Sequence, residues 1–287
     1  MPEIPRWSAG RGLAPGAIAT IVPNVVENLA AQAVLETRDL TVRFGGHVAV
    51  NAVTCAFHRG TLTAIVGPNG AGKTTYFNLI SGQIPATAGE VFLFGKNISH
   101  LAAPLRTRLG IGRAFQLTNL FPFLSVHENV RIAVQARAKL GIQLFSLWNS
   151  RRDLIEKADA ILEEVALARQ RDVPAMTLPH GDQRKLEVGM MLALEPEVFM
   201  FDEPTAGMSV DEVPVILDLI KRIKTKADKC ILLVEHKMEV VSELADRIIV
   251  LHNGSLVADG APQEVIASPV VQEAYLGVAP KAREAAS

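Results

Sequence analysis

Cysteine and long apolar runs are scarce in this chain of 287 residues. The only two cysteines, Cys55 and Cys230, stand far apart inside apolar runs, without the spacing of metal ligands. They are therefore expected to be small core residues of a protein in a reducing compartment. The sequence also lacks a run of about 20 uninterrupted apolar residues, the length that a membrane-spanning helix needs. The chain itself is therefore not expected to cross a membrane.

An excess of charge of either sign is absent too. Lysine and arginine number 29 against 30 acidic residues, which leaves a formal net charge of −1. Proteins that bind nucleic acids broadly carry a strong basic excess, so this balance argues against a nucleic-acid partner. Hydrophobic residues make up 49% of the chain, enough for a sizeable core.

The chain is expected to hold one large domain with a leader and a tail. Residues 1–33 are rich in Gly, Pro and Ala and are interpreted as a flexible leader. The domain then spans residues 34–277, and residues 278–287 form a tail. Within the domain, residues 125–190 have a helical texture, with apolar residues recurring at three- and four-residue intervals. They predict a helical subdomain inserted between strands.

Short apolar runs at 61–66, 198–201 and 230–234 alternate with helical patterns, which predicts an α/β fold with a mostly parallel sheet. The runs at 247–251 and 255–259 flank Asn253-Gly254, a pair that suits a tight hairpin turn. Antiparallel β elements are therefore expected beside the parallel sheet.

A phosphate-binding loop is the strongest single signal. The sequence Gly67-Pro-Asn-Gly-Ala-Gly-Lys-Thr74 matches GxxxxGK[ST], directly after the apolar run at 61–66. Glycines let backbone N–H groups curl around phosphate oxygens, the lysine adds positive charge, and the hydroxyl of Thr74 is a ligand for Mg²⁺. The motif predicts a nucleoside triphosphate site, and its residues are Gly67, Pro68, Asn69, Gly70, Ala71, Gly72, Lys73, Thr74 and Thr75.

Two adjacent carboxylates follow a second apolar run. Asp202 and Glu203 end VFMFDEP, where one carboxylate can hold Mg²⁺ through water and its neighbour can polarise an attacking water as general base. Alone, such a pair is more often a plain turn. Beside a phosphate loop, it predicts hydrolysis of ATP.

With these motifs the chain resembles the ABC ATPase family, from about Val34 to Gly277. The resemblance implies a P-loop NTPase fold and three further site residues. Gln116, in GRAFQL, would contact Mg²⁺ and the attacking water, and His236, in LLVEHKM, would contact the γ-phosphate. Phe44, in VRFGG, would stack on the adenine ring, the alternative being an ordinary core aromatic.

The segment that corresponds to the family's signature loop, usually LSGGQ, departs from the family pattern. Pro179 stands where the family has serine, and His180 replaces a glycine, while Gly181 is retained. A helix that follows would still direct its N-terminal dipole at a phosphate, and Asp182 is a candidate N-cap for it. The loop comprises Leu178, Pro179, His180, Gly181, Asp182 and Gln183.

This variant loop, TAGMS at 205–209 and the segment 257–277 are similar to the branched-chain amino acid and urea or amide importer branch of the family. The resemblance implies transmembrane permease subunits as partners and, indirectly, an extracytoplasmic solute-binding protein. The site would be split across a dimer, with a second ATPase subunit that is either another copy or a related protein. The expected location is the cytoplasmic face of the plasma membrane.

Two alternatives remain at this point: an ABC ATPase that powers export of a lipid or drug, and a P-loop kinase unrelated to transport. The apolar segment 117–124 is either a docking surface for the permease or part of the core.

Overall fold

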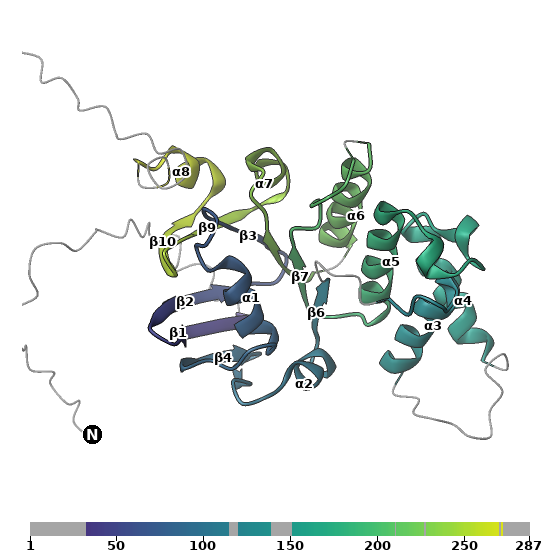
Figure 1. The fold of residues 1–287 in the computed structure, drawn as a ribbon, viewed down its shortest axis with the longest axis horizontal. Helices are drawn as coiled ribbons and strands as arrows, with labels where there is room; N and C mark the ends of the chain where they lie inside the picture. The colour runs from purple at the N-terminus through teal and green to yellow at the C-terminus, as the bar shows by residue number, and fades with distance from the viewer. Residues whose placement is uncertain are drawn as a thin grey trace, which may run out of the picture.

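The computed structural model describes residues 33–114, 120–138, 151–209, 211–226, 228–269 and 271. Within this part of the chain, two β-sheets flank a central helix and a helical subdomain lies to one side (Figure 1). Residues 1–32 of the expected leader and all residues after 271 lie outside the described residues, so the predicted leader and tail stay predictions.

The larger sheet has six strands in the order β10-β9-β3-β8-β7-β6. Its strands are β3 (Leu62–Val66), β6 (Ile111–Ala114), β7 (Val198–Asp202), β8 (Cys230–Val234), β9 (Arg247–His252) and β10 (Ser255–Gly260). All neighbours pair in parallel except β9 and β10, which form the predicted antiparallel hairpin. Asn253 and Gly254 adopt φ values of 47° and 77° in its turn, as the sequence predicts.

The smaller sheet is antiparallel, in the order β2-β1-β4-β5. Its strands are β1 (Leu35–Phe44), β2 (His47–Phe57), β4 (Ala88–Leu93) and β5 (Lys96–Asn97). Helix α1 (Lys73–Ser81) lies between the two sheets, because Tyr76, Phe77, Leu79 and Ile80 pack with core residues of both. The helix that follows the phosphate loop is thus held on both sides.

The other helices cover the remaining faces of the six-stranded sheet. Helices α7 (Met238–Leu244) and α8 (Pro262–Ala267) pack on β3 and β9, while α6 (Val213–Lys226) shares a core with β7 and β8. Cys55 and Cys230 are buried, as predicted, and burial raises the pKa of both thiols to about 12. In the described part of the chain, no helix combines the length and the apolar character needed to cross a bilayer.

The predicted helical subdomain is present and consists of α3 (Val126–Arg137), α4 (Arg152–Glu164) and α5 (His180–Ala193). Two short 3₁₀ turns, Ala168–Gln170 and Ala175–Thr177, connect α4 to α5. The predicted apolar face of α4 is buried in the subdomain core, with Leu154, Ala158, Ile161, Leu162 and Val165 each at most 8% exposed.

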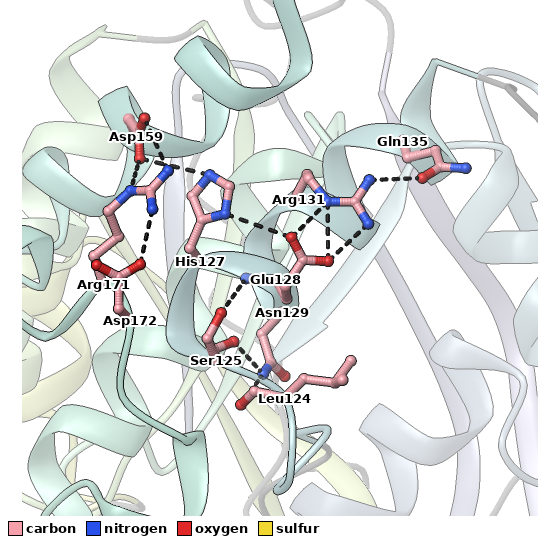
Figure 2. A network of polar contacts seen from close by, with 10 residues as sticks. All are labelled: Leu124, Ser125, His127, Glu128, Asn129, Arg131, Gln135, Asp159, Arg171 and Asp172. Carbon is pink, nitrogen blue, oxygen red and sulfur yellow. Dashed lines mark hydrogen bonds and ion pairs between the residues drawn. The ribbon is translucent and has the colours of Figure 1, made fainter. Parts of the chain in front are cut away.

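Polar contacts tie α3 to α4 and to the segment that follows it (Figure 2). His127 is buried between Glu128 and Asp159, with nitrogen–oxygen distances of 3.6 and 3.5 Å. Arg131 donates to both oxygens of Glu128, and Arg171 donates to Asp159. Each carboxylate beside His127 therefore also has an arginine partner.

Ser125-Val-His-Glu128, at the start of α3, has the spacing of a capping box, and one of its two hydrogen bonds forms. Ser125 Oγ accepts a hydrogen bond from the N–H of Glu128 at 3.1 Å. The Glu128 carboxylate is engaged by Arg131, because that pairing is charge-assisted and stronger than a bond to a backbone amide.

Arg106 on α2 (Ala103–Arg108) closes the C-terminal end of α1. Its guanidinium is buried and donates to the carbonyl oxygens of Leu79, Ile80, Ser99 and Leu101 at 2.8–2.9 Å. Two of these acceptors, the carbonyls of Leu79 and Ile80, belong to the last turn of α1, where a helix runs out of backbone N–H partners.

Substituting Arg106 with Met should lower the free energy of unfolding by about 2 kcal/mol or more, because buried carbonyls lose their donors. Urea denaturation measures this loss. Arg108→Met on the same helix is the matched control, since Arg108 is exposed and should change stability by less than about 0.5 kcal/mol. Equal losses in the two variants would contradict the capping role of Arg106.

Candidate active site

The phosphate loop joins the end of β3 to the start of α1, the placement that the motif requires. Gly67 and Gly72 have φ values of 153° and 97°, and both pack against backbone. A Cβ at Gly67 would lie 2.1 Å from the carbonyl oxygen of Leu251, and one at Gly72 would lie 2.4 Å from that of Ala49. Glycine is therefore required at both positions. Beyond them, Asn69, Gly70 and Thr74 are exposed, so this surface is open to a phosphate chain.

Lys73 bends back over the loop. Its Nζ donates to the carbonyl oxygens of Gly67 at 2.7 Å and Pro68 at 3.0 Å. Burial lowers the pKa of Lys73, and the nearby negative charges of Glu203 and Asp202 act in the opposite direction. The ammonium group is thus within electrostatic range of both predicted carboxylates.

Asp202 ends β7 and is almost fully buried. Its Oδ2 accepts a hydrogen bond from Arg113 at 2.6 Å, while its buried Oδ1 has no hydrogen-bond partner among the described residues. Glu203 follows with φ at 50°, a left-handed conformation that is uncommon outside glycine. Its N–H donates to Val234 O at 2.9 Å, which fixes this strained position beside β8.

The oxygen donors at this edge fit a small divalent cation. Thr74 is exposed and carries a hydroxyl, and Asp202 presents an oxygen that has no hydrogen-bond partner among the described residues. The described residues contain no cluster of three or more His, Cys, Asp or Glu side chains that would hold a metal by themselves. This set suits Mg²⁺, which binds through one or two protein ligands together with substrate phosphates and water.

His236 follows β8 and lies beside Glu203. Its Nδ1 is 3.6 Å from Glu203 Oε1, and its side chain is 46% exposed. The preceding residue, Glu235, is buried and accepts hydrogen bonds from the Thr205 hydroxyl at 2.6 Å and the His236 N–H at 3.1 Å. Glu235 therefore links the segments that carry Glu203 and His236.

Phe44 lies at the end of β1 and is 52% exposed. The alternative that it is a core aromatic is therefore wrong, while its role in stacking on adenine stays a prediction. Gln116 lies outside the described residues, so its predicted contacts stay a prediction as well.

The 178–183 loop forms the start of α5, with Pro179 at the N-cap position and exposed, like His180. The interpretation of Asp182 as N-cap is wrong: it lies in the first helical turn and pairs with Lys185 at 2.7 Å. The backbone there is already helical, and the helix has no side-chain cap. Leu178 is buried, and its carbonyl accepts from Gln183 Nε2 at 2.9 Å.

Gly181 allows the loop after β7 to pack against α5. A Cβ at this position would lie 2.0 Å from Glu212 Oε1. The N–H and hydroxyl of Ser209 both donate to Glu212 Oε2 at 2.9 Å. Hydrogen bonds from Ser209, and a further one from the Gly181 backbone, lower the pKa of Glu212. Ser209 thus anchors the carboxylate that joins these two loops.

The site combines a strand, a glycine loop carrying Lys73, a helix, and two carboxylates at the end of a second parallel strand, which β8 separates from the first. Together these features define a P-loop nucleoside triphosphatase. The chain belongs to the ABC transporter family, whose model matches residues 50–206. A second model, of the branched-chain amino acid ATP-binding cassette transporter, matches residues 255–281.

Curated relatives and solved structures agree with this assignment. The chain is 34% identical to the high-affinity branched-chain amino acid transport ATP-binding protein LivG of Escherichia coli K12, over 87% of this chain and 100% of LivG. It is 36% identical to BraF of Pseudomonas aeruginosa, described in the same words, over 86% and 98%. The ADP conformation of MJ1267, an ATP-binding cassette of an ABC transporter, matches with a TM-score of 0.73 and 29% identity, over 86% of this chain and 99% of that chain.

Sequence reasoning missed three residues that organise the site: Arg113, Thr205 and Glu235. Each stands within a segment that already drew attention, next to Gln116, Glu203 or His236. For Arg113 and Glu235 the available signal was a charged residue within or directly after an apolar strand, because a buried charge requires a partner. This signal does not apply to Thr205, which is uncharged.

Replacing Lys73 with Ala should weaken ATP binding about 100-fold, because a charge-assisted contact to phosphate contributes about 3 kcal/mol at most. Isothermal titration calorimetry with ATP measures the change. Lys96→Ala, at an exposed lysine of the smaller sheet, is the control and should bind as the parent does. Unchanged binding in Lys73→Ala would disprove the phosphate-loop assignment.

Proposed function

We propose that this chain is the ATP-hydrolysing subunit of an ABC importer for branched-chain amino acids or related amides. The proposal rests on Lys73, Asp202 and Glu203, because together they combine phosphate binding with a candidate general base. The cargo class rests on LivG, BraF and the model that matches residues 255–281. Phosphate release without a phosphorylated acceptor would separate this function from that of a kinase.

In the proposed reaction, the loop amides and the N-terminal end of α1 bind the β- and γ-phosphates of ATP, and Lys73 neutralises part of their charge. Thr74 and Asp202 would hold Mg²⁺, which offsets charge that develops on the phosphates. Glu203 accepts a proton from the attacking water, and His236 binds the γ-phosphate. Phe44 stacks on adenine, and Gln116 completes the metal site.

The site is proposed to be split between two ATPase subunits. Helix α5 lies on the far side of β6 and β7 from α1 in Figure 1, so the 178–183 loop is displaced from its own phosphate loop. The exposed Pro179 and His180 leave the start of α5 free to approach a phosphate on another subunit. ATP then joins two subunits, and its hydrolysis releases them. The second subunit is another copy or a related ATPase.

A Glu203→Gln variant should bind Mg²⁺-ATP but hydrolyse it at least about 100-fold more slowly, because the amide cannot act as a base. Its mass in solution should change from monomer to dimer only when Mg²⁺-ATP is present. Adding Lys73→Ala to this variant is the matched control and should keep it monomeric. Turnover near the parent rate would remove Glu203 as the base. ATP binding without dimer formation would rule out assembly of two copies alone and require a related ATPase or the permease.

An apolar surface beside α3 is the proposed docking site for the permease. The surface comprises Phe121, Phe123, Leu124, Val173 and Met176, which are 37–82% exposed. Two backbone hydrogen bonds, from Ala175 to Leu124 and from Met176 to Pro122, join its two segments. Residues 117–119 of the predicted docking segment lie outside the described residues.

Asn129 gives this surface a fixed backbone. Its buried side chain donates to the carbonyl oxygens of Leu124 and Ser125 (Figure 2) and accepts from the N–H of Phe121 at 2.8 Å. A rigid apolar surface suits a protein partner, because less conformational entropy is lost on binding. Through this partner the chain would lie at the cytoplasmic face of the membrane, with the solute-binding protein on the opposite side.

Exchanging Phe123 for Ser should reduce copurification with the permease subunits severalfold while leaving ATP binding unchanged. Phe123 is the most exposed aromatic at this surface, at 82%, and its truncation removes apolar contact area. Phe94→Ser is the control, since Phe94 is 44% exposed and lies at the end of β4 in the other sheet. Equal losses in both variants would contradict a specific docking role.

A further inference from the structure

Arg113, the third residue of β6, connects three side chains from two other elements. Its Nη2 donates to Asp202 Oδ2 at 2.6 Å, at the end of β7. Its Nη1 donates to Asn78 Oδ1 at 2.7 Å and Ser81 Oγ at 2.9 Å, both on α1. The guanidinium therefore spans the space between α1 and the end of β7.

This contact lies in a buried setting. The side chains of Arg113 and Asp202 are 7% and 1% exposed, and the guanidinium carbon lies 5.6 Å from the centre of the Phe77 ring. A buried, charge-assisted hydrogen bond orients a carboxylate more strongly than a solvent-exposed hydrogen bond does. Because Arg113 holds Oδ2, the other oxygen of Asp202, Oδ1, is the one left without a partner among the described residues.

The two elements that Arg113 joins are those that carry the proposed metal ligands. Thr74 lies in the first turn of α1, and Asp202 is the last residue of β7. We propose that Arg113 is a positioning residue for the divalent cation: it sets the separation of α1 from β7 and fixes the Asp202 carboxylate with Oδ1 available. This inference rests on the proposed function, since it presumes that Mg²⁺ enters with ATP.

Arginine suits this role better than lysine. Its planar fork donates in several fixed directions at once, whereas a lysine ammonium is a point charge on a flexible chain. Residues that orient a metal-binding side chain commonly change metal affinity by about 10- to 100-fold when they are replaced. If charge alone mattered, removal of the positive guanidinium would strengthen cation binding instead. A positioning role therefore predicts weaker Mg²⁺ binding in Arg113→Gln, whereas an effect of charge alone predicts stronger binding.

The test compares ATP affinity with and without metal, by calorimetry in the Glu203→Gln background so that ATP is not consumed. The ratio of the dissociation constant in EDTA to that in excess Mg²⁺ measures how strongly the protein uses the cation. Arg113→Gln and Arg113→Lys should each lower this ratio about tenfold or more, with ATP binding in EDTA within about twofold of the parent. Asn78→Ala, which removes one anchor on α1, should lower the ratio to a smaller extent.

Arg106→Lys is the matched control, because Arg106 is also buried and bonded to α1, but its hydrogen bonds among the described residues go to backbone carbonyl oxygens. It should reduce thermal stability and leave the ratio unchanged. An unchanged or larger ratio in Arg113→Gln overturns the inference, as does a parent-like ratio in Arg113→Lys. Loss of ATP binding in EDTA in the Arg113 variants would also overturn it. Failure of the Glu203→Gln parent to bind ATP would instead contradict the proposed function.

Discussion

The carboxyl ends of β3, β7 and β8 meet at one edge of the six-stranded sheet, and the whole candidate site depends on that alignment. Parallel pairing brings the phosphate loop, Asp202 and His236 together, although long stretches of chain separate them. An antiparallel neighbour in place of β7 or β8 would direct the end of that strand to the opposite edge. The polar groups gather here because ligands of open α/β sheets bind at the carboxyl ends of the strands.

Burying charge at this edge requires partners, and each buried charge found here has one. Lys73 contacts carbonyls of its own loop and lies near Asp202 and Glu203, while Arg113 pairs with Asp202. Glu235 is held by Thr205. An isolated buried charge would be strongly destabilising, so these groups form a connected set. A cation or phosphate that binds next to one of these charged side chains therefore changes the electrostatic surroundings of the others.

The helical subdomain supplies two surfaces that the sheet edge lacks. The start of α5 presents the exposed Pro179 and His180, and the surface around Phe123 is apolar and backed by Asn129. Both belong to a unit whose core is continuous with that of the six-stranded sheet and α6, and which has a polar network around His127. A rigid unit of this kind is suited to transmit a change at the nucleotide to a partner, because its packed helices move together.

Local sequence determined the elements whose signals are short-range. Three kinds of local signal predicted these elements: glycine positions for the phosphate loop and the Asn253-Gly254 hairpin, short apolar runs for the strands at 61–66 and 230–234, and a three-to-four-residue period for the apolar face of α4. Resemblance to the ABC ATPases added the remaining site residues. The prediction of Asp182 as N-cap was wrong, because the helix begins two residues earlier, at His180.

Tertiary structure decided what depends on packing between distant segments. The pairing of Arg113 with Asp202 and the contact of Glu212 with the start of α5 each join residues that are far apart in the chain. The exposure of Phe44 and Phe123 likewise depends on which segments pack around them. No local pattern encodes which arginine reaches which carboxylate, since that contact arises only when β6, β7 and α1 are packed together. Sequence therefore identified the phosphate loop and the carboxylates, and three-dimensional packing determined how they are held.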